Sequence, residues 1–268
     1  MITGRIKFLK QSVARFANAG SITADDGTDA SVLLNERGEE SWVSTVSDGS
    51  NVTISVSFGS SFVNRIMIVG HNVRDFTITG EFSGITDINN NTIPDGNIAV
   101  TGNTLDTSYF AFDPQPNLST FDINLGNTIV AGENKTIRRI IVAEEIGTYK
   151  GFPVIKQISF NLNSRDVKSK GGPQLITKQR RVLKKIPLQF RNYTQIEDIA
   201  LTDQLHLSQA PFLIWPCGGD EKQFRYPISG YRLQDIYKVQ TKGDFRTSFK
   251  DGSYRQLISA TINFVEAI

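Results

Sequence analysis

An alternation of apolar and polar residues between Asn51 and Phe58 limits what this chain can fold into more than any other feature. The apolar positions of the alternation are Val52, Ile54, Val56 and Phe58. Successive side chains of a β-strand point to opposite faces, so the pattern predicts a strand with one buried face. Val63 to Val69 is more uniformly apolar, which indicates a second, central strand after a turn at Gly59. Short strands with turn signals between them continue along the chain, and they predict a mainly β protein.

One stretch departs from this strand pattern and predicts a helix. Thr194 and Glu197 have the spacing of a capping box, and apolar residues follow at helical spacing. Pro211 ends the predicted helix, because its ring blocks continuation. Phe212 to Trp215 then reads as a short buried strand before a turn at Gly218 and Gly219. We therefore expect a single helix packed across a β-sheet.

The distribution of charge divides the chain into two parts. Residues 1–150 contain 11 Lys and Arg against 17 Asp and Glu, a net charge of −6, whereas residues 151–268 contain 18 against 10, a net charge of +8. The glycines and proline of Gly147 to Pro153 lie beside this switch and favour a domain boundary there. The opposite net charges of the two parts would favour head-to-tail association between copies of the chain. Two solvated surfaces without functional consequence explain the charge distribution equally well.

The cysteine content and the apolar runs bound the class of protein. Cys217 is the one cysteine, which excludes an intramolecular disulfide framework and any multi-cysteine metal site. The first residues place cations among the apolar ones and lack a signal-peptide core. No apolar run approaches the roughly 20 residues that span a bilayer. These features predict a soluble protein made in a cytoplasm without export or membrane insertion.

The residues that commonly carry catalysis are sparse. The two histidines, His71 and His206, fall in different predicted domains, and no Gly-x-Ser-x-Gly elbow presents a nucleophile. We therefore predict no enzyme activity, no catalytic residue and no cofactor.

One loop has the spacing of a calcium site. Asp87, Asn89 and Asn91 alternate as calcium ligands do, but Thr92 and Ile98 replace the glycine and glutamate of an EF-hand. A looser structural cation site and a polar surface loop stay open as interpretations, and we predict no metal ligand.

Basic residues gather in the second part and are candidates for a subunit interface. They are Arg165, Lys168, Lys170, Lys178, Arg180, Arg181, Lys184 and Lys185. Such a run attracts phosphates, but no nucleic-acid-binding motif or interleaved aromatic residue accompanies it. A solvated face, or half of an ion-pair network between subunits, is the preferred interpretation, and no specific nucleic acid is expected.

Trp42 and His71 are candidates for glycan binding. An exposed indole ring packs well on the apolar face of a sugar. The alternative is that Trp42 belongs to the core, as a Trp directly before a strand usually does, and that His71 lies at a strand end. We favour the core interpretation of Trp42.

The first part resembles the discoidin, or F5/8 type C, family of galactose-binding-like jelly rolls. The resemblance rests on Trp42-Val-Ser, the strand to Phe58-Gly59, Val63 to Gly70, Asp75 to Ile78, and Arg138 to Val142. The cysteine pair that brackets secreted members of the family is absent here. The resemblance implies a jelly-roll sandwich over residues 1–150, with a host-surface glycan as a possible partner.

The second part resembles the tail-tube-like domains of long-tailed bacteriophages. The matching features are the capped helix from Thr194, Ala210 to Pro216, and the closing strand Ile258 to Glu266. The resemblance implies a split-barrel-like β-sandwich flanked by one α-helix over residues 151–268. It also implies a structural virion protein of the distal tail or baseplate, made in the host cytoplasm, whose copies form a hexameric or trimeric ring. Its partners would be the tail tube, tape-measure and baseplate hub proteins, and the first part would decorate the ring. A carbohydrate-binding module protein that recognises the host surface is the alternative function.

Overall fold

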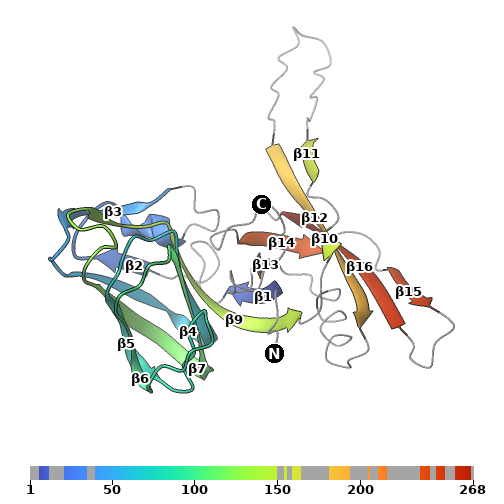
Figure 1. Ribbon diagram of the computed structural model, residues 1–268. Coiled ribbons are helices and arrows are strands. Elements are labelled where there is room, and N and C mark those ends of the chain that lie inside the picture. Colours follow the sequence, from blue (N-terminus) through green and yellow to red (C-terminus); the bar gives the residue numbers. More distant parts are fainter. Residues whose placement is uncertain are drawn as a thin grey trace, which may run out of the picture. The chain divides into compact units, whose positions relative to one another are not determined.

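The structure is a computed structural model, and Figure 1 shows its strands. It describes residues 6–11, 21–34, 40–149, 154–155, 159–163, 181–193, 205, 211–215, 236–241, 246–250 and 257–266. The elements before residue 100 are β1 (Ile6–Gln11), β2 (Ser21–Ala24), the 3-10 helix η1 (Ala30–Leu34), β3 (Trp42–Ser47), β4 (Val52–Val69), β5 (Phe76–Phe82) and β6 (Gly96–Val100). The later strands are β7 (Thr107–Leu125), β8 (Asn134–Ile137), β9 (Arg139–Tyr149), β10 (Val154–Ile155), β11 (Ser159–Asn163), β12 (Arg181–Tyr193), β13 (Phe212–Trp215), β14 (Tyr237–Thr241), β15 (Arg246–Lys250) and β16 (Leu257–Glu266). The predicted mainly β fold class is confirmed.

Contacts group the chain into two compact units. The first unit contains Met1–Thr148 and Leu213–Tyr237, and the second contains Tyr149–Phe212 and Lys238–Ile268. The division into residues 1–150 and 151–268 stays a prediction. Most of β13 belongs to the first unit, although the predicted boundary assigns the whole strand to the second part.

A long antiparallel ribbon of β4 and β7 builds the sandwich of the first unit. The two strands run side by side along their lengths (Figure 1), from the pair Val52↔Leu125 to the pair Val69↔Thr107. The register shifts three times between Ser57 and Arg65, where the ribbon bends. One half of the ribbon pairs with β2 and β5, and the other half pairs with β9. The predicted turn at Gly59 is therefore wrong, because β4 continues through it as one bulged strand.

The main core lies between the two halves of this ribbon. Val52, Ile54 and Val56 from the first half of β4 share one apolar cluster with Ile66 and Ile68 from the second half. The predicted alternation is confirmed, since the odd positions between these residues are half-buried or exposed. Burying alternate residues from both halves of a bent ribbon removes the apolar faces of two sheets from water together.

A second apolar cluster explains why Val63 to Val69 is apolar at almost every position. Met67 and Val69 point away from the main core and pack with Tyr109 and Ile141. Strand β1 lies beside β9 and carries β13 on its other edge, with Leu9 paired to Leu213. Leu9, Leu213 and Trp215 belong to the second cluster. The predicted central position of this part of β4 is confirmed, because both its faces are buried.

Strands β3 and β8 form a separate two-stranded sheet. Trp42 pairs with Ile137, and both side chains belong to the main core. Lys135 of β8 is fully buried, and its Nζ donates to the backbone oxygen of Ser47 at 3.0 Å. The small sheet therefore adds apolar side chains to the core. Its buried Lys135 side chain has a backbone oxygen of the same sheet as hydrogen-bond partner.

The second unit is organised by the antiparallel pair of β12 and β16. Their register runs from Lys185↔Val265 to Tyr193↔Ile258. Strands β10 and β11 pair with β12, and β14 and β15 pair with β16. Of the predicted helix from Thr194, only Leu205 is among the described residues, and it is helical and buried. Within the described part of the chain, no helix has the length and apolar character needed to cross a membrane.

Candidate ligand-binding site

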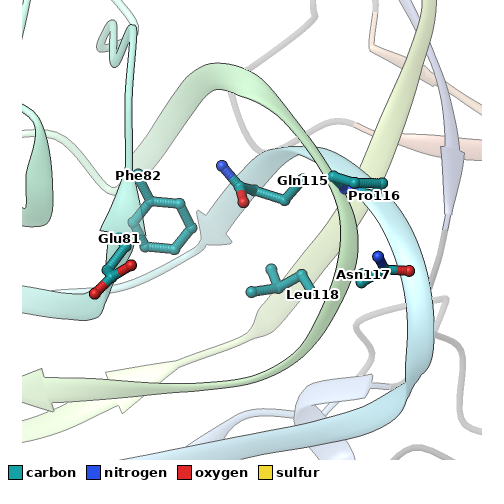
Figure 2. A pocket seen from close by; sticks show the side chains of 6 residues that line it. All are labelled: Glu81, Phe82, Gln115, Pro116, Asn117 and Leu118. Atoms are coloured by element: carbon teal, nitrogen blue, oxygen red, sulfur yellow. The ribbon is translucent and has the colours of Figure 1, made fainter.

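An open hollow lies where the sandwich of the first unit bends. It has a volume of about 360 Å³ and is lined by Glu81, Phe82, Gln115, Pro116, Asn117 and Leu118. Figure 2 shows Glu81 and Phe82 across from Gln115 and Leu118, with Pro116 and Asn117 on the curve of β7. We call these six residues the bend hollow. Its volume falls within the range of about 300–1,000 Å³ that is usual for small-molecule sites.

The bend hollow opens because two neighbouring strands part. The ladder between β5 and β7 ends at Thr79↔Asp122, whereas β5 continues to Phe82. Strand β7 contains Pro114 and Pro116 in this region, and proline has no backbone N–H to donate to a ladder. Residues 113–118 therefore bulge and bend instead of following β5.

The floor of the bend hollow is the ring of Phe82, which folds back over Gly80. A Cβ added at Gly80 would lie 2.4 Å from Cε2 of Phe82. The ring is 2% exposed, and its centroid lies 4.8 Å from that of Phe112. Gly80 is thus required by this close approach of ring to backbone.

Gly80→Ala is expected to lower the free energy of unfolding by about 2 kcal/mol, because the added methyl group forces the packed Phe82 ring aside. Gly59→Ala is the matched control, since a Cβ there meets no atom within 4 Å. The control should change stability by no more than about 0.5 kcal/mol. Urea denaturation measures the free energy of unfolding of both variants. Equal effects of the two substitutions would contradict the close packing of the Phe82 ring on Gly80.

The rim of the bend hollow carries polar groups above the apolar floor. Gln115 is half-buried, and its Nε2 donates to the backbone oxygen of Asp113 at 3.5 Å. Asn117 is exposed, and its Oδ1 accepts from Ser60 Oγ at 3.3 Å. Glu81 is exposed and adds a carboxylate. The bend hollow therefore combines one carboxylate and two amides, which can bond hydroxyl groups, with the accessible apolar surfaces of Pro116 and Leu118.

Trp42, a candidate for glycan stacking, lies in the core. Its side chain is 0% exposed, and the backbone of Gly27 covers the indole so closely that a Cβ there would be 2.9 Å from Nε1. A stacking platform needs an exposed ring face, which Trp42 does not offer. The structure agrees with the core interpretation of Trp42.

His71, the second glycan candidate, is 3% exposed and forms a pair with Ser108 that the sequence analysis missed. Its Nε2 lies 2.9 Å from Ser108 Oγ, and its Nδ1 accepts from the backbone N–H of Val73 at 3.2 Å. Because Nδ1 accepts a hydrogen bond, the neutral ring carries its proton on Nε2 and donates it to Ser108. Burial lowers the pKa of His71 to about 4. A protonated Nε2 cannot take the Ser108 proton, so this pair lacks the arrangement of a nucleophile and its base. Its two members are 37 residues apart in the sequence and share no motif.

The Asp87 loop is closed by its own hydrogen bonds. Asp87 Oδ1 accepts from the backbone N–H groups of Asn89 and Asn91, both at 2.8 Å, and Oδ2 accepts from Asn91 Nδ2 at 2.9 Å. Asn90 adopts a positive φ of 60° at the turn. Among the described residues, no group of three or more His, Cys, Asp and Glu side chains is arranged to hold a metal ion. The geometry is that of a polar surface loop.

The predicted basic interface falls mainly outside the described residues. Arg165, Lys168, Lys170, Lys178 and Arg180 lie there, whereas Arg181, Lys184 and Lys185 lie on β12. The backbone of these three residues pairs with Asn163, Phe160 and Ser159 of β11. Their role at a subunit interface stays a prediction.

A half-buried polar cluster lies beside the second apolar cluster, and the sequence analysis did not identify it. Glu145 Oε2 accepts from Arg65 Nε at 2.7 Å and from the Tyr109 hydroxyl at 3.1 Å, and it lies 3.7 Å from Lys7 Nζ. Lys7 Nζ also lies 5.2 Å from the Tyr109 ring centroid. Burial lowers the pKa of Lys7 against the opposing effect of Glu145, and burial followed by the Glu145 charge raises the pKa of Tyr109. We call these four residues the Glu145 cluster.

Comparison with known proteins gives matches among solved structures. No protein-family model and no curated protein matches the chain. A variant of chitosan-binding module 1 from a chitosanase/glucanase of Paenibacillus sp. IK-5 matches with 15% identity and a TM-score of 0.38, over 50% of this chain and 100% of the module. The family 32 carbohydrate-binding module of C. perfringens NanJ, in complex with galactose, matches with 17% identity and a TM-score of 0.37, over 50% and 98% of the two chains. A fucose-binding module of Streptococcus pneumoniae matches with 10% identity and a TM-score of 0.34, over 49% and 95%.

Proposed function

We propose that this chain is a carbohydrate-binding protein and that the bend hollow is its binding site. The observation that carries the proposal is the combination of an apolar floor with a polar rim in one open hollow of about 360 Å³. A sugar has apolar C–H faces and a ring of hydroxyl groups, and it needs both kinds of contact. Pro116 and Leu118 offer the first kind above the buried Phe82 ring, and Glu81, Gln115 and Asn117 offer the second.

Binding in the bend hollow requires no large rearrangement of the backbone. Ser83 Oγ donates to Asp113 Oδ2 at 2.9 Å, and the backbone N–H of Asp113 donates to the Ser83 oxygen at 2.9 Å. These bonds fix the segment after β5 to the start of the β7 bend. A site whose walls are already fixed loses less conformational entropy when it binds.

Gln115→Ala and Asn117→Ala are each expected to weaken glycan binding about fivefold, the equivalent of one hydrogen bond of about 1 kcal/mol. A glycan array with the full-length chain identifies the ligand, and calorimetric titration then measures the two variants. The full chain is needed because β13, at residues 212–215, pairs with β1. Asn51→Ala is the matched control, since Asn51 is an exposed amide outside the hollow. Absence of saturable binding to any glycan, or equal loss in all three variants, would count against the proposal.

A structural role in a bacteriophage tail is the second candidate, and it rests on the strands of the second unit. The sequence resemblance implies a β-sandwich closed by a C-terminal strand, and β16 pairs with β12 over residues 258–265. In this proposal the second unit forms a ring with other copies, and the carbohydrate-binding unit decorates it. Electron microscopy of the purified chain tests ring formation. A species that stays monomeric at all concentrations and is absent from virions contradicts this role.

A further inference from the structure

We propose that the first unit has a second binding site, for a single neutral sugar or a polyol of similar size, between the Asp87 loop and the segment after β6. A second hollow of about 370 Å³ lies there, and its lining includes Asp87, Asn89, Thr101, Thr104 and Ser108. We call it the loop hollow. It shares no lining residue with the bend hollow, so this proposal does not depend on the proposed function.

The lining of the loop hollow includes Ser108, a buried residue whose hydroxyl group has hydrogen-bonding capacity to spare. Ser108 is 5% exposed, and its Oγ accepts the proton that His71 carries on Nε2. The backbone N–H of Val73 donates to His71 Nδ1, so the ring proton is on Nε2 and the histidine is the donor to Ser108. The serine hydroxyl hydrogen therefore still needs an acceptor, and a buried donor without one is costly. An oxygen atom of a ligand in the loop hollow can accept this hydrogen.

One wall of the loop hollow is the hairpin that contains Asp87. The backbone N–H of Thr86 donates to the Ala111 oxygen at 2.8 Å, and the N–H of Ile93 donates to the Ile85 oxygen at 2.9 Å. The Asp87 carboxylate is occupied by the loop's own N–H groups. This carboxylate holds the wall in shape, and its negative charge disfavours an anionic ligand.

A second wall, the segment after β6, is equally well fixed. Asn103 Nδ2 donates to the backbone oxygens of Val73 and Leu105 at 3.0 and 2.7 Å, and its Oδ1 accepts from the Leu105 N–H at 3.1 Å. The N–H of Gly102 donates to Asp75 Oδ1 at 2.8 Å. Thr101 and Thr104 stay exposed on this wall. A preorganised wall carrying threonine hydroxyls suits an uncharged ligand that both donates and accepts hydrogen bonds.

Apolar side chains complete the lining and restrict the ligand class further. Ile88, Ile93, Val100 and Leu105 line the loop hollow and are half-buried. They favour a ligand with C–H faces over a simple ion or water cluster. The combination of hydroxyl and amide groups with aliphatic walls in one hollow of about 370 Å³ points to a neutral polyhydroxyl molecule.

The test uses the full-length chain labelled with ¹⁵N and titrated with D-galactose, D-glucose and D-mannose. At least one of these sugars is expected to cause saturable shifts of the backbone amides between Thr101 and Ser108. Thr104→Trp places a large ring in the loop hollow and is expected to weaken this binding at least about tenfold. Thr120→Trp is the matched control, because Thr120 is exposed elsewhere on β7. Ser108→Ala is expected to weaken the binding about fivefold.

The outcomes separate the two sites. Chemical-shift changes confined to Gln115–Leu118 would overturn the binding site in the loop hollow and support the one in the bend hollow. Changes in neither place would overturn both sites for these sugars. Unchanged affinity of Thr104→Trp would overturn the second site even where shifts are seen. Should Ser108→Ala fail to fold, because His71 loses its acceptor, Thr104→Trp decides alone.

Discussion

Glu145→Gln is expected to lower the free energy of unfolding by about 3 kcal/mol, because it removes the one negative charge of the Glu145 cluster. Arg65 and Lys7 each have a side chain 17% exposed, and Glu145 is 12% exposed. Without the carboxylate, two half-buried cations would face a neutral amide whose NH₂ group is itself a donor. Urea denaturation followed by fluorescence measures the loss, since Trp215 lies 5.1 Å from Tyr109 between ring centroids.

Glu144→Gln is the matched control for this prediction. Glu144 is the neighbouring residue, and its carboxylate lies 3.7 Å from Lys10 Nζ, but these side chains are 36% and 68% exposed. Exposed ion pairs contribute about 0–1 kcal/mol, so the control should change stability by less than about 1 kcal/mol. A result in which the two variants are equally stable would show that the cluster does not stabilise the fold.

The stability of the first unit is expected to fall by about 3 kcal/mol when the pH is lowered from about 6.5 to about 4. Burial lowers the pKa of His71 from 6.5 to about 4. The unfolded chain therefore binds a proton at His71 as the pH falls through 6.5, whereas the folded chain stays neutral there until about pH 4. The proton uptake favours the unfolded state across this window, and the full contribution of His71 is present above it.

His71→Asn tests this assignment through the slope of stability against pH. The shorter amide keeps an acceptor for the Val73 N–H but does not titrate. The slope between pH 4 and 6.5 should flatten in this variant, whatever its absolute stability. Hydrogen bonds, opposed by burial, lower the pKa values of Asp26, Asp48 and Asp75, so the stability that these carboxylates add is lost as the pH falls below about 5, equally in both proteins. An unchanged slope in His71→Asn would contradict the buried neutral histidine.

The elements that sequence reasoning identified are those whose burial follows a regular period. The alternation from Val52 to Phe58 gives the buried face of β4 correctly, and the uniform run to Val69 indicates its two buried faces. Strand β1 was missed because Lys7 and Lys10 interrupt its apolar residues. Lys7 is tolerated there because Glu145, 138 residues later, lies 3.7 Å from its Nζ. Pairing across such a separation leaves no local pattern.

The candidate sites were harder to predict, because they depend on where ladders stop. The bend hollow exists because β5 leaves β7 after Thr79 and because two prolines interrupt the ladder of β7. Pro114 and Pro116 mark an irregular strand in the sequence. The sequence does not show, however, that Glu81 and Phe82 face this part of β7. Trp42 was a candidate because aromatic rings serve both sugar binding and core packing, and only its burial separates the two roles.

The pairing of β1 with β13 has a consequence for how the chain is made. Residues 7–9 find their partners at residues 213–215, so β1 leaves the ribosome long before β13 and has to wait for this partner. Strands β2 to β9 pair among themselves and can fold while the second half is still being synthesised. Until β13 emerges, Met67, Tyr109 and Ile141 lack the cover that Leu213 and Trp215 later provide. The nascent chain therefore passes through a stage with a folded sandwich and one uncovered apolar face, a stage at which a chaperone is expected to bind it.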